Sequence, residues 1–140
     1  MVCLGNICRS PLTQGILYSK IKKNSFIDSA RTASYHIGRS PDPRSILAAK
    51  KKGIDISNYK ARKLIKEDFK KFDFIYVMDN SNFENATSMA DSKEERDKVS
   101  LIHPLKKEVP DPYYGEKKDF KVRYSILENA CNNIVLDLNL

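Results

Sequence analysis

A cysteine and an arginine near the start of the chain, Cys3 and Arg9, are spaced for attack on a phosphate ester. Five residues separate them, which is the length of a small loop around one phosphate group. A thiolate is a strong nucleophile, and a guanidinium holds two phosphate oxygens in a fork that a lysine cannot reproduce. The pair therefore predicts in-line attack by the Cys3 sulfur and a cysteinyl-phosphate intermediate.

The residues between and after this pair suit a loop that binds an anion. Gly5 and Asn6 are residue types that tolerate left-handed backbone conformations, so the loop can curl with successive N–H groups pointing inward. Ser10 is a favourable N-cap and Pro11 suits the first helical position. A helix that begins there turns the positive end of its dipole toward the same cavity and stabilises a thiolate. The Ser10 hydroxyl can also hydrogen-bond the sulfur and help it leave in a second step.

The run Val2–Pro11, Val-Cys-Leu-Gly-Asn-Ile-Cys-Arg-Ser-Pro, is similar to the active-site signature of the low-molecular-weight protein tyrosine phosphatases. The resemblance extends over nearly the whole chain. The later matching segments, in the family's order, are Asp28–Ala30, Tyr35–Gly38, Pro41–Arg44, Ala61–Arg62, Phe72–Ile75, Met78–Asp79 and Asp111–Gly115. The first run and the late Asp-Pro-Tyr-Tyr are together far more specific than either alone.

The resemblance implies catalytic roles for three residues. Cys3 is the nucleophile, Arg9 binds the phosphate, and Asp111 is the general acid that protonates the leaving phenolate and later the base that activates water. Asp111 stands between Pro110 and Pro112, which keep this turn stiff and non-helical. A carboxylic acid held near the leaving oxygen suits the reaction, because protonation helps a phenolate to leave. The implied activity is hydrolysis of phosphotyrosine and of small aryl phosphates, without a cofactor or metal.

The resemblance also implies how the substrate is held. Leu4 and Ile7 line the floor beside the phenyl ring, and Tyr35, Tyr113 and Tyr114 form an aromatic wall. The other expected phosphate-binding residues are Gly5, Asn6, Cys8 and Ser10. A deep cleft with such walls favours phosphotyrosine, because the shorter side chain of phosphoserine could not bring its phosphate to the loop.

A hydrogen-bond network is expected to hold the loop in shape, with Asn6 and Ser29 as its members. The family adds a histidine just before the Ala61–Arg62 pair. This chain has Ser57–Lys60 there and no histidine, so Asn58 is the residue that could take its place.

The other cysteines have two interpretations. By the resemblance, Cys8 is a resolving thiol that closes a disulfide with oxidised Cys3 and protects it from further oxidation. The alternative is a small packed residue. Cys131 falls on the inner face of the last helix and is expected in the core.

Three other functions share parts of the pattern. A thiol-coupled arsenate reductase needs two further cysteines to relay a disulfide, and Cys131 stands alone. Protein arginine phosphatases of the same fold prefer threonine at the position of Ile7, whereas isoleucine favours an aromatic substrate. A non-catalytic phosphopeptide-binding module would lack the nucleophile or the acid, and both Cys3 and Asp111 are present.

Length and composition further limit the classes of protein to which the chain can belong. At 140 residues the chain predicts one domain, 1–140. The net charge of +7 comes from lysine clusters without interleaved aromatics, which favours solvated helix faces over nucleic-acid binding. Three cysteines with a reactive pair in one loop favour a reducing, cytoplasmic compartment. No apolar run reaches membrane-spanning length, no signal peptide is expected, and the two histidines lack zinc-ligand spacing. The expected partners are phosphotyrosine proteins and phosphate or other oxyanions, bound by a monomer.

The hydrophobic pattern predicts strands that alternate with helices. Helices are expected over 10–23, 42–52 and 66–71, from 81, near 94, and over 119–137; strands are expected at 26–30, 72–78 and 99–103 and directly before the loop. This α/β alternation predicts a single-domain three-layer sandwich with a four-stranded parallel sheet, which the resemblance makes flavodoxin-like, of the phosphotyrosine phosphatase I-like type. The loop then lies at the carboxyl end of a strand, where ligands bind in such folds. Only Met1 and Val2 precede Cys3, so we expect a short first strand.

Overall fold

Four short parallel strands form the centre of the molecule in the computed structural model, which describes residues 1–35, 37–113 and 115–140, with the side chain of Lys117 excepted. The strands are β1 (Val2–Cys3), β2 (Ala30–Arg31), β3 (Ile75–Val77) and β4 (Val99–Leu101). Their order across the sheet is β2-β1-β3-β4, and each neighbouring pair is parallel. The predicted four-stranded parallel sheet is therefore confirmed.

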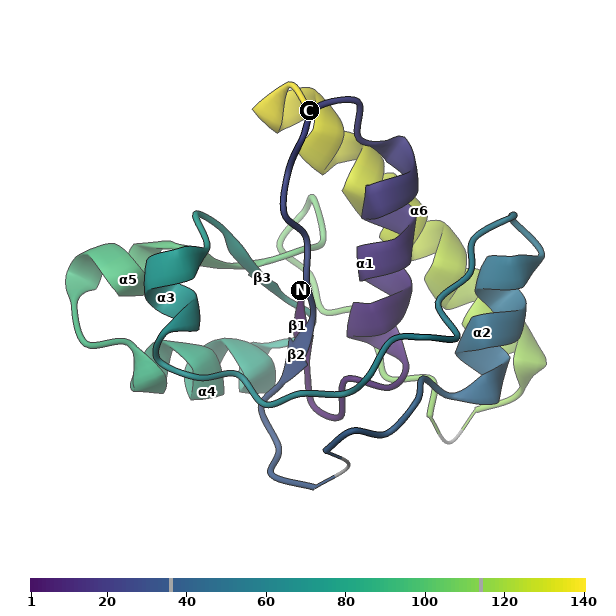
Figure 1. Ribbon diagram of the computed structural model, residues 1–140, viewed down its shortest axis with the longest axis horizontal. Coiled ribbons are helices and arrows are strands. Elements are labelled where there is room, and N and C mark those ends of the chain that lie inside the picture. The colour runs from purple at the N-terminus through teal and green to yellow at the C-terminus, as the bar shows by residue number, and fades with distance from the viewer. Residues whose placement is uncertain (36, 114) are drawn as a thin grey trace.

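Helices cover both faces of this sheet, as Figure 1 shows. One layer consists of α1 (Arg9–Lys20), α2 (Pro43–Lys50) and α6 (Lys117–Leu138); the other consists of α3 (Asp68–Lys71), α4 (Asn80–Met89) and α5 (Lys93–Asp97). The three-layer α/β arrangement agrees with the sequence-based prediction. No helix in the described part of the chain is long and apolar enough to cross a membrane.

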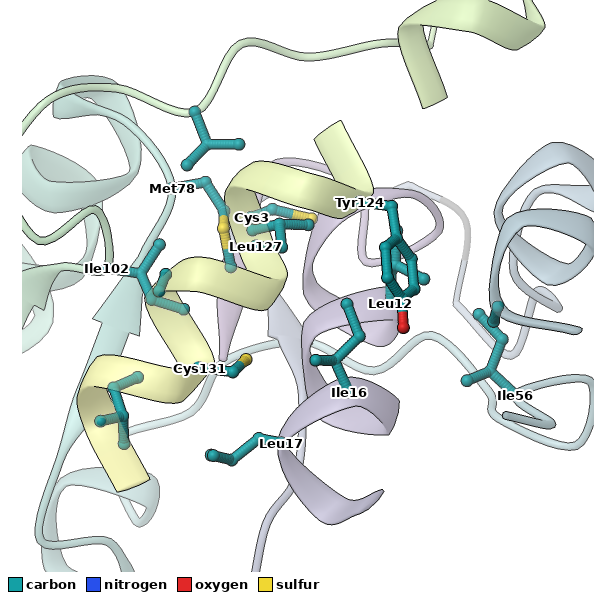
Figure 2. Packing of buried hydrophobic residues seen from close by; sticks show 14 residues of the cluster. Cys3, Leu12, Ile16, Leu17, Ile56, Met78, Ile102, Tyr124, Leu127 and Cys131 are labelled. Carbon is teal, nitrogen blue, oxygen red and sulfur yellow. The ribbon is translucent and has the colours of Figure 1, made fainter. Parts of the chain in front are cut away.

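The larger hydrophobic core lies between α1 and α6 (Figure 2). Leu12 and Ile16 of α1 face Leu127 and Cys131 of α6, and all four side chains are buried. Each buried aliphatic side chain of this size contributes about 1.5–3 kcal/mol to the folded state. The expectation that Cys131 belongs to the core is confirmed, and burial raises the pKa of its thiol to about 12. Cys3 contacts the same cluster, so the proposed nucleophile rests on well-packed side chains.

The start of α1 differs from the prediction. Ser10 was expected to cap the helix, but the N-cap is Cys8, without a side-chain cap, and Ser10 lies within the first turn. Its hydroxyl is instead engaged with Cys3 Sγ at 3.1 Å and with Asn6 Nδ2 at 2.8 Å. A tertiary hydrogen bond has thus replaced the local one that the residue type favours.

The strands are also shorter than predicted. Of the expected strand 26–30 only the last residue is part of β2, and of 72–78 only Ile75–Val77 forms β3. The β2 ladder ends with the central strand β1, which consists of only Val2 and Cys3. In contrast, β3 contacts β1 through Val77 alone and pairs along its full length with β4, so its ladder ends with the three residues of β4.

Candidate active site

A cavity of about 220 Å³ opens where β1 ends and α1 begins. Its lining residues are Cys3, Leu4, Gly5, Ile7, Cys8, Arg9, Tyr35, Asp111 and Tyr113. The fold therefore brings together side chains from both ends of the chain that the sequence analysis had singled out. Asn6, Ser10 and Ser29 are buried next to this lining. Tyr114, also expected in the wall, lies outside the described residues.

Within the loop between Cys3 and Arg9, one residue adopts the strained left-handed backbone conformation. Asn6 has φ +54°, in the left-handed region. Gly5 does not have a positive φ, so the expectation that it shares this conformation is wrong. The carbonyl oxygens of Cys3, Leu4 and Ile7 accept hydrogen bonds from Thr32, Ala33 and Asp42 N–H outside the loop. With these carbonyls committed outward, the backbone N–H groups are the polar atoms left to face the cavity.

The Cys3 sulfur has two hydrogen-bond partners. Ser10 Oγ lies 3.1 Å from Sγ, and the Asn6 backbone N–H donates to Sγ at 3.3 Å. Cys3 is buried and lies directly before the first turn of α1. The sulfur therefore lies at the positive end of the α1 dipole, within reach of two hydrogen-bond donors.

Arg9 is held by acidic and carbonyl groups at the rim. Its Nη1 donates to Asp79 Oδ2 at 2.7 Å and to Val109 O at 2.8 Å, and its Nη2 donates to Asp111 Oδ2 at 3.3 Å. Burial alone would lower the pKa of Arg9, but the negative charges of Cys3, Asp111 and Asp79 outweigh it and raise this pKa above its ordinary value. Nε is buried and has no hydrogen-bond partner in the described part of the chain. That N–H is available to an oxyanion in the cavity.

Asp79 is a site residue that the sequence analysis gave no role. It lies two residues after the end of β3 and caps α4, because its Oδ1 accepts the Asn82 N–H at 2.8 Å while its Oδ2 accepts the hydrogen bond from Arg9. Its position was a usable signal, because the carboxyl ends of parallel strands meet at one edge of the sheet.

A network of buried polar side chains holds the loop from behind. Asn6 Nδ2 donates to Ser10 Oγ at 2.8 Å and to Ser29 Oγ at 2.9 Å, and Asn6 Oδ1 accepts the Arg62 N–H at 3.0 Å. The Ser29 hydroxyl in turn donates to Gln14 Oε1 at 2.6 Å. Asn6 and Ser29 are therefore placed as expected.

The suggested replacement for the missing histidine is wrong. Asn58 is exposed, and Gln14 is the residue that completes the Ser29 environment. Gln14 follows Ser10 by one helical turn on α1, so the two share a face of that helix. This spacing was the only sequence signal for its role.

Arg44 ties the segment around Asp111 to the rest of the site. Its guanidinium pairs with Asp42 at 2.8 Å and donates to the carbonyl oxygens of Gly115 at 2.8 Å and Tyr113 at 2.6 Å. The hydrogen bonds that Arg44 donates to Asp42 and the charge of that carboxylate raise the pKa of Arg44. Asp111 Oδ1 accepts the Tyr113 N–H at 3.0 Å, which fixes the carboxylate above Arg9. The Asp111 side chain remains 40% exposed, so its carboxylate is in contact with solvent.

A buried arginine supports the opposite wall. Arg31 is fully buried, and its guanidinium donates to the carbonyl oxygens of Ala33, Ser34 and Tyr35. These three residues form the turn that carries the Tyr35 ring to the cavity. The sequence analysis assigned Arg31 no role.

Cys3, Cys8 and Cys131 are all free thiols. Cys8 lines the cavity but is buried, and burial, followed by the nearby charges of Asp42 and Asp111, raises the pKa of its thiol far above the ordinary range. At neutral pH Cys8 is therefore a protonated neighbour of Cys3.

Known proteins match this chain over nearly its full length. A family model described as Low molecular weight phosphotyrosine protein phosphatase matches residues 1–139. A low molecular weight phosphotyrosine protein phosphatase of Schizosaccharomyces pombe is 38% identical over 96% of this chain and 92% of its own.

Two solved structures have the same fold. One is a protein tyrosine phosphatase from Entamoeba histolytica with Hepes in its active site. It has a TM-score of 0.90 at 34% identity, and the match covers 99% of this chain and 94% of that one. Wzb of Vibrio vulnificus, in complex with benzylphosphonate, has a TM-score of 0.90 at 30% identity over 97% of this chain and 94% of that one.

Proposed function

The chain belongs to the low molecular weight phosphotyrosine protein phosphatase family and is a protein tyrosine phosphatase, and from that premise we propose that Cys3, Arg9 and Asp111 perform its reaction. The observation that carries this assignment is that the three side chains line one cavity, although more than 100 positions of sequence separate Arg9 from Asp111. Arg9 contacts Asp111 directly at 3.3 Å, so the phosphate-binding cation and the acid are already adjacent.

The first step transfers the phosphoryl group to sulfur. The Cys3 thiolate attacks phosphorus in line with the scissile P–O bond, a P–S bond forms, and the tyrosyl oxygen leaves with the proton of the Asp111 carboxyl group. Arg9 Nε and the loop N–H groups stabilise the charge that develops on the three equatorial oxygens.

The second step releases phosphate. A water molecule gives its proton to the Asp111 carboxylate and attacks phosphorus, and the P–S bond breaks. The Ser10 hydroxyl, 3.1 Å from Sγ, donates to the departing thiolate and makes it a better leaving group. Inorganic phosphate leaves, and Asp111 is again protonated for the next turnover.

The cavity walls suit an aryl phosphate. Tyr35 and Tyr113 line opposite segments of the cavity, and Leu4 and Ile7 add apolar surface between them. The benzylphosphonate bound to Vibrio vulnificus Wzb has the same combination of a phenyl ring and a tetrahedral oxyanion, which supports this substrate class here. The substrates we propose are phosphotyrosine residues of proteins.

Hydrolysis of an aryl phosphate by three purified proteins tests the assignment. Cys3→Ser should abolish turnover, and Asp111→Asn should lower kcat by about 10²–10³-fold, the range typical of a lost general acid. Asp97→Asn, an exposed carboxylate of α5, is the matched control and should keep full activity. Phosphate affinity should not fall in Asp111→Asn, and a chelator should leave the wild type active. Full activity of Cys3→Ser would refute the proposal.

The cellular setting that we propose is a monomer in the cytoplasm, with residues 1–140 as one phosphatase domain. Free thiols at Cys3, Cys8 and Cys131 suit a reducing compartment, and the proposed catalytic residues come from a single chain. Sedimentation of the active protein tests the monomer.

Cys8 is proposed as a guard of the nucleophile. Peroxide oxidises the Cys3 thiolate to a sulfenic acid; the Cys8 thiol then attacks that sulfur, water leaves, and a disulfide forms. The two residues line the same cavity, which supports this pairing. Mass spectrometry of peroxide-treated protein should find the Cys3–Cys8 bridge, and irreversible oxidation of Cys3 without it would count against the role.

A further inference from the structure

The two ends of the Asn6 side-chain amide are held by two different segments of the chain. Its Oδ1 accepts the Arg62 backbone N–H at 3.0 Å, and its Nδ2 donates to the Ser29 hydroxyl at 2.9 Å. The side chains of Asn6 and Ser29 are both buried. The amide makes both bonds at once only while the donor on one segment and the acceptor on the other keep a fixed separation. The distance between the two segments therefore decides whether Asn6 can hold its position.

The side chain of Arg62 connects the same two segments. Its Nε donates to Asp28 Oδ2 at 2.8 Å, and Asp28 directly precedes Ser29. The Asp28 Oδ1 accepts the Ser29 N–H at 2.8 Å, so the carboxylate and the serine are fixed to each other. These contacts close a ring. It runs from the Asn6 amide to the Arg62 backbone, through the guanidinium to Asp28, and back to the amide through Ser29.

A second carboxylate orients the guanidinium within this ring. Arg62 Nη1 donates to Asp68 Oδ2 at 2.9 Å, and the Ile65 N–H donates to the same oxygen at 2.9 Å. Asp68 is buried. Burial alone would lower the pKa of Arg62, but the hydrogen bond to Asp68 and the charges of Asp28 and Asp68 raise it above its ordinary value. A planar guanidinium bound along two of its edges has little freedom to rotate, so its contact with Asp28 is well defined.

Main-chain hydrogen bonds join the two segments on the other side of Ser29. The Arg31 N–H donates to Arg62 O, and the Leu64 N–H donates to Arg31 O, both at 2.9 Å. These bonds follow Ser29 in the chain, whereas Asp28 precedes it, so the segments are joined on both sides of the serine. Loss of the ion pair would leave the join on one side, and Ser29 could then move away from Arg62.

We propose that Arg62 is a positioning residue for phosphate binding, because its ion pair with Asp28 keeps Ser29 at the distance that the Asn6 amide spans. Asn6 has φ +54°, which is unfavourable for a residue with a side chain, so its conformation depends on these bonds. When the ring opens, the loop spends part of its time outside the conformation that binds phosphate. The inference rests on the proposed phosphate-binding role of this loop.

Kinetics of Arg62→Met test the role, because methionine keeps much of the aliphatic length and removes the guanidinium. A ligand that needs the closed loop binds with an apparent dissociation constant divided by the fraction of molecules that have that loop. We expect the KM for an aryl phosphate and the inhibition constant of inorganic phosphate to rise by the same factor, about three- to tenfold. Because saturating substrate restores the loop, kcat should stay within about twofold.

Asp28→Asn removes the charge on the other side of the ion pair and should change both constants in the same direction. The double variant should show no more than the effect of Arg62→Met alone, since both substitutions break one interaction. If Arg62→Met does not fold, Asp28→Asn carries the same test. All assays are run at a temperature at which the amide spectrum shows each variant to be fully folded.

Two further variants serve as controls. Arg62→Lys keeps the positive charge and can pair with one carboxylate, so it should recover part of the lost affinity. Lys20→Met breaks an ion pair of similar exposure, to Glu128 at 3.5 Å, which joins α1 to α6. This control should leave the KM and the phosphate inhibition constant unchanged.

The inference is refuted if Arg62→Met and Asp28→Asn lower only the free energy of unfolding and leave both constants as in the wild type. It is also refuted if kcat falls while the phosphate inhibition constant stays the same, or if Lys20→Met changes the constants equally. Failure of the proposed function would be recognised separately. Inorganic phosphate would then leave the amide resonances of residues 3–9 unperturbed in the wild type, whereas failure of this inference alone leaves those shifts in place.

Discussion

Gln14 supports the strained residue of the phosphate-binding loop through one intermediate. Asn6 adopts a left-handed conformation, which is unfavourable by about 1 kcal/mol or more for a residue with a side chain. Its amide is fixed by Ser29, and Ser29 is oriented by donating its own proton to Gln14 at 2.6 Å. Gln14 thus decides which way the Ser29 lone pairs point, and so whether Asn6 can donate to them.

Replacement of Gln14 by leucine should weaken the loop. The Ser29 hydroxyl loses its acceptor and can turn away from Asn6, so we expect a loss of about 1–2 kcal/mol in the free energy of unfolding and a several-fold fall in kcat/KM. Urea unfolding and aryl phosphate kinetics measure both. Gln14→Glu keeps the acceptor and gives up only the 3.4 Å bond to Ile27 O, so it should retain most of the activity. Equal losses in both variants would exclude this role.

Replacement of Arg31 should weaken the binding of the substrate ring and leave the binding of phosphate unchanged. Arg31→Ala releases the turn that presents Tyr35, so the KM for an aryl phosphate should rise about three- to tenfold with little change in kcat, the pattern of lost uniform binding. The inhibition constant of inorganic phosphate, which has no ring, should stay constant. Tyr35→Ala should give the same change, and the double variant no further one. A parallel change in the phosphate constant would instead indicate general damage to the site.

At the scale of elements, the start of α2 joins the two segments that carry the proposed catalytic residues. The Asp42 N–H donates to Ile7 O at 2.7 Å, and the Asp42 side chain caps α2 and holds Arg44. Arg44 in turn holds the carbonyl oxygens of Tyr113 and Gly115. The loop that carries Cys3 and the segment that carries Asp111 are therefore attached to the same helix end, which fixes their separation.

Stability should depend on the charge of Asp42. Burial alone would raise its pKa, but the hydrogen bonds and charge of Arg44 hold it below its ordinary value. The stabilisation is therefore complete above the unfolded pKa of about 3.9 and is lost as the pH falls below it. Asp42→Asn should lower the free energy of unfolding by about 1–2 kcal/mol at pH 7 and by much less near pH 3. A difference that stays constant with pH, relative to an Asp97→Asn control, would disprove the linkage.

The local elements were predictable from sequence because their causes are local. The Asp42 cap and Pro43 at the start of α2 were correctly predicted. The predicted end was two residues too late, because α2 ends at Lys50 and Gly53, with φ +75°, lies in the turn that follows. The true start of α1 was missed because the hydroxyl of Ser10 bonds to a sulfur seven positions away instead of its own helix end.

The supporting side chains of the site were harder to predict from the sequence. Arg31 acts on carbonyl groups of a turn that has no regular structure, and Gln14 acts on a serine of another element. Ser29 was expected from the family resemblance, but no motif marks Arg31 or Gln14 as a supporting residue of the site. The lining residues between Cys3 and Arg9 were found because an anion-binding loop constrains their types, whereas Tyr35, Asp111 and Tyr113 were found through the family resemblance.

At the scale of the whole molecule, the net charge of +7 is spread over exposed lysines on several helices and loops. A phosphotyrosine residue brings two negative charges, and acidic neighbours add more. The positive field therefore raises the rate of encounter with acidic phosphopeptides, an effect that salt screens within about 10 Å at 0.1 M.

Added salt should therefore change kcat/KM differently for substrates with acidic and with basic flanking residues. We expect kcat/KM for a phosphotyrosine peptide with acidic flanks to fall by about tenfold between low salt and roughly 0.5 M, because steering is lost. A peptide of equal length with lysine flanks should change little or rise. Steady-state assays over a salt series measure both. The same salt dependence for the two peptides would show that the field plays no part in substrate choice.

The unpartnered Nε of Arg9 also links the reaction product to folding. A buried donor without an acceptor lowers the stability of the native state by about 1–3 kcal/mol, and an oxyanion bound only to the folded chain restores it. By mass action, such a ligand at a hundred times its dissociation constant adds about 2.7 kcal/mol. Inorganic phosphate then has opposite effects on one molecule: it slows turnover by occupying the site, and it protects the chain from unfolding and proteolysis. At low phosphate concentration the molecule is therefore expected to turn over fastest and to resist unfolding least.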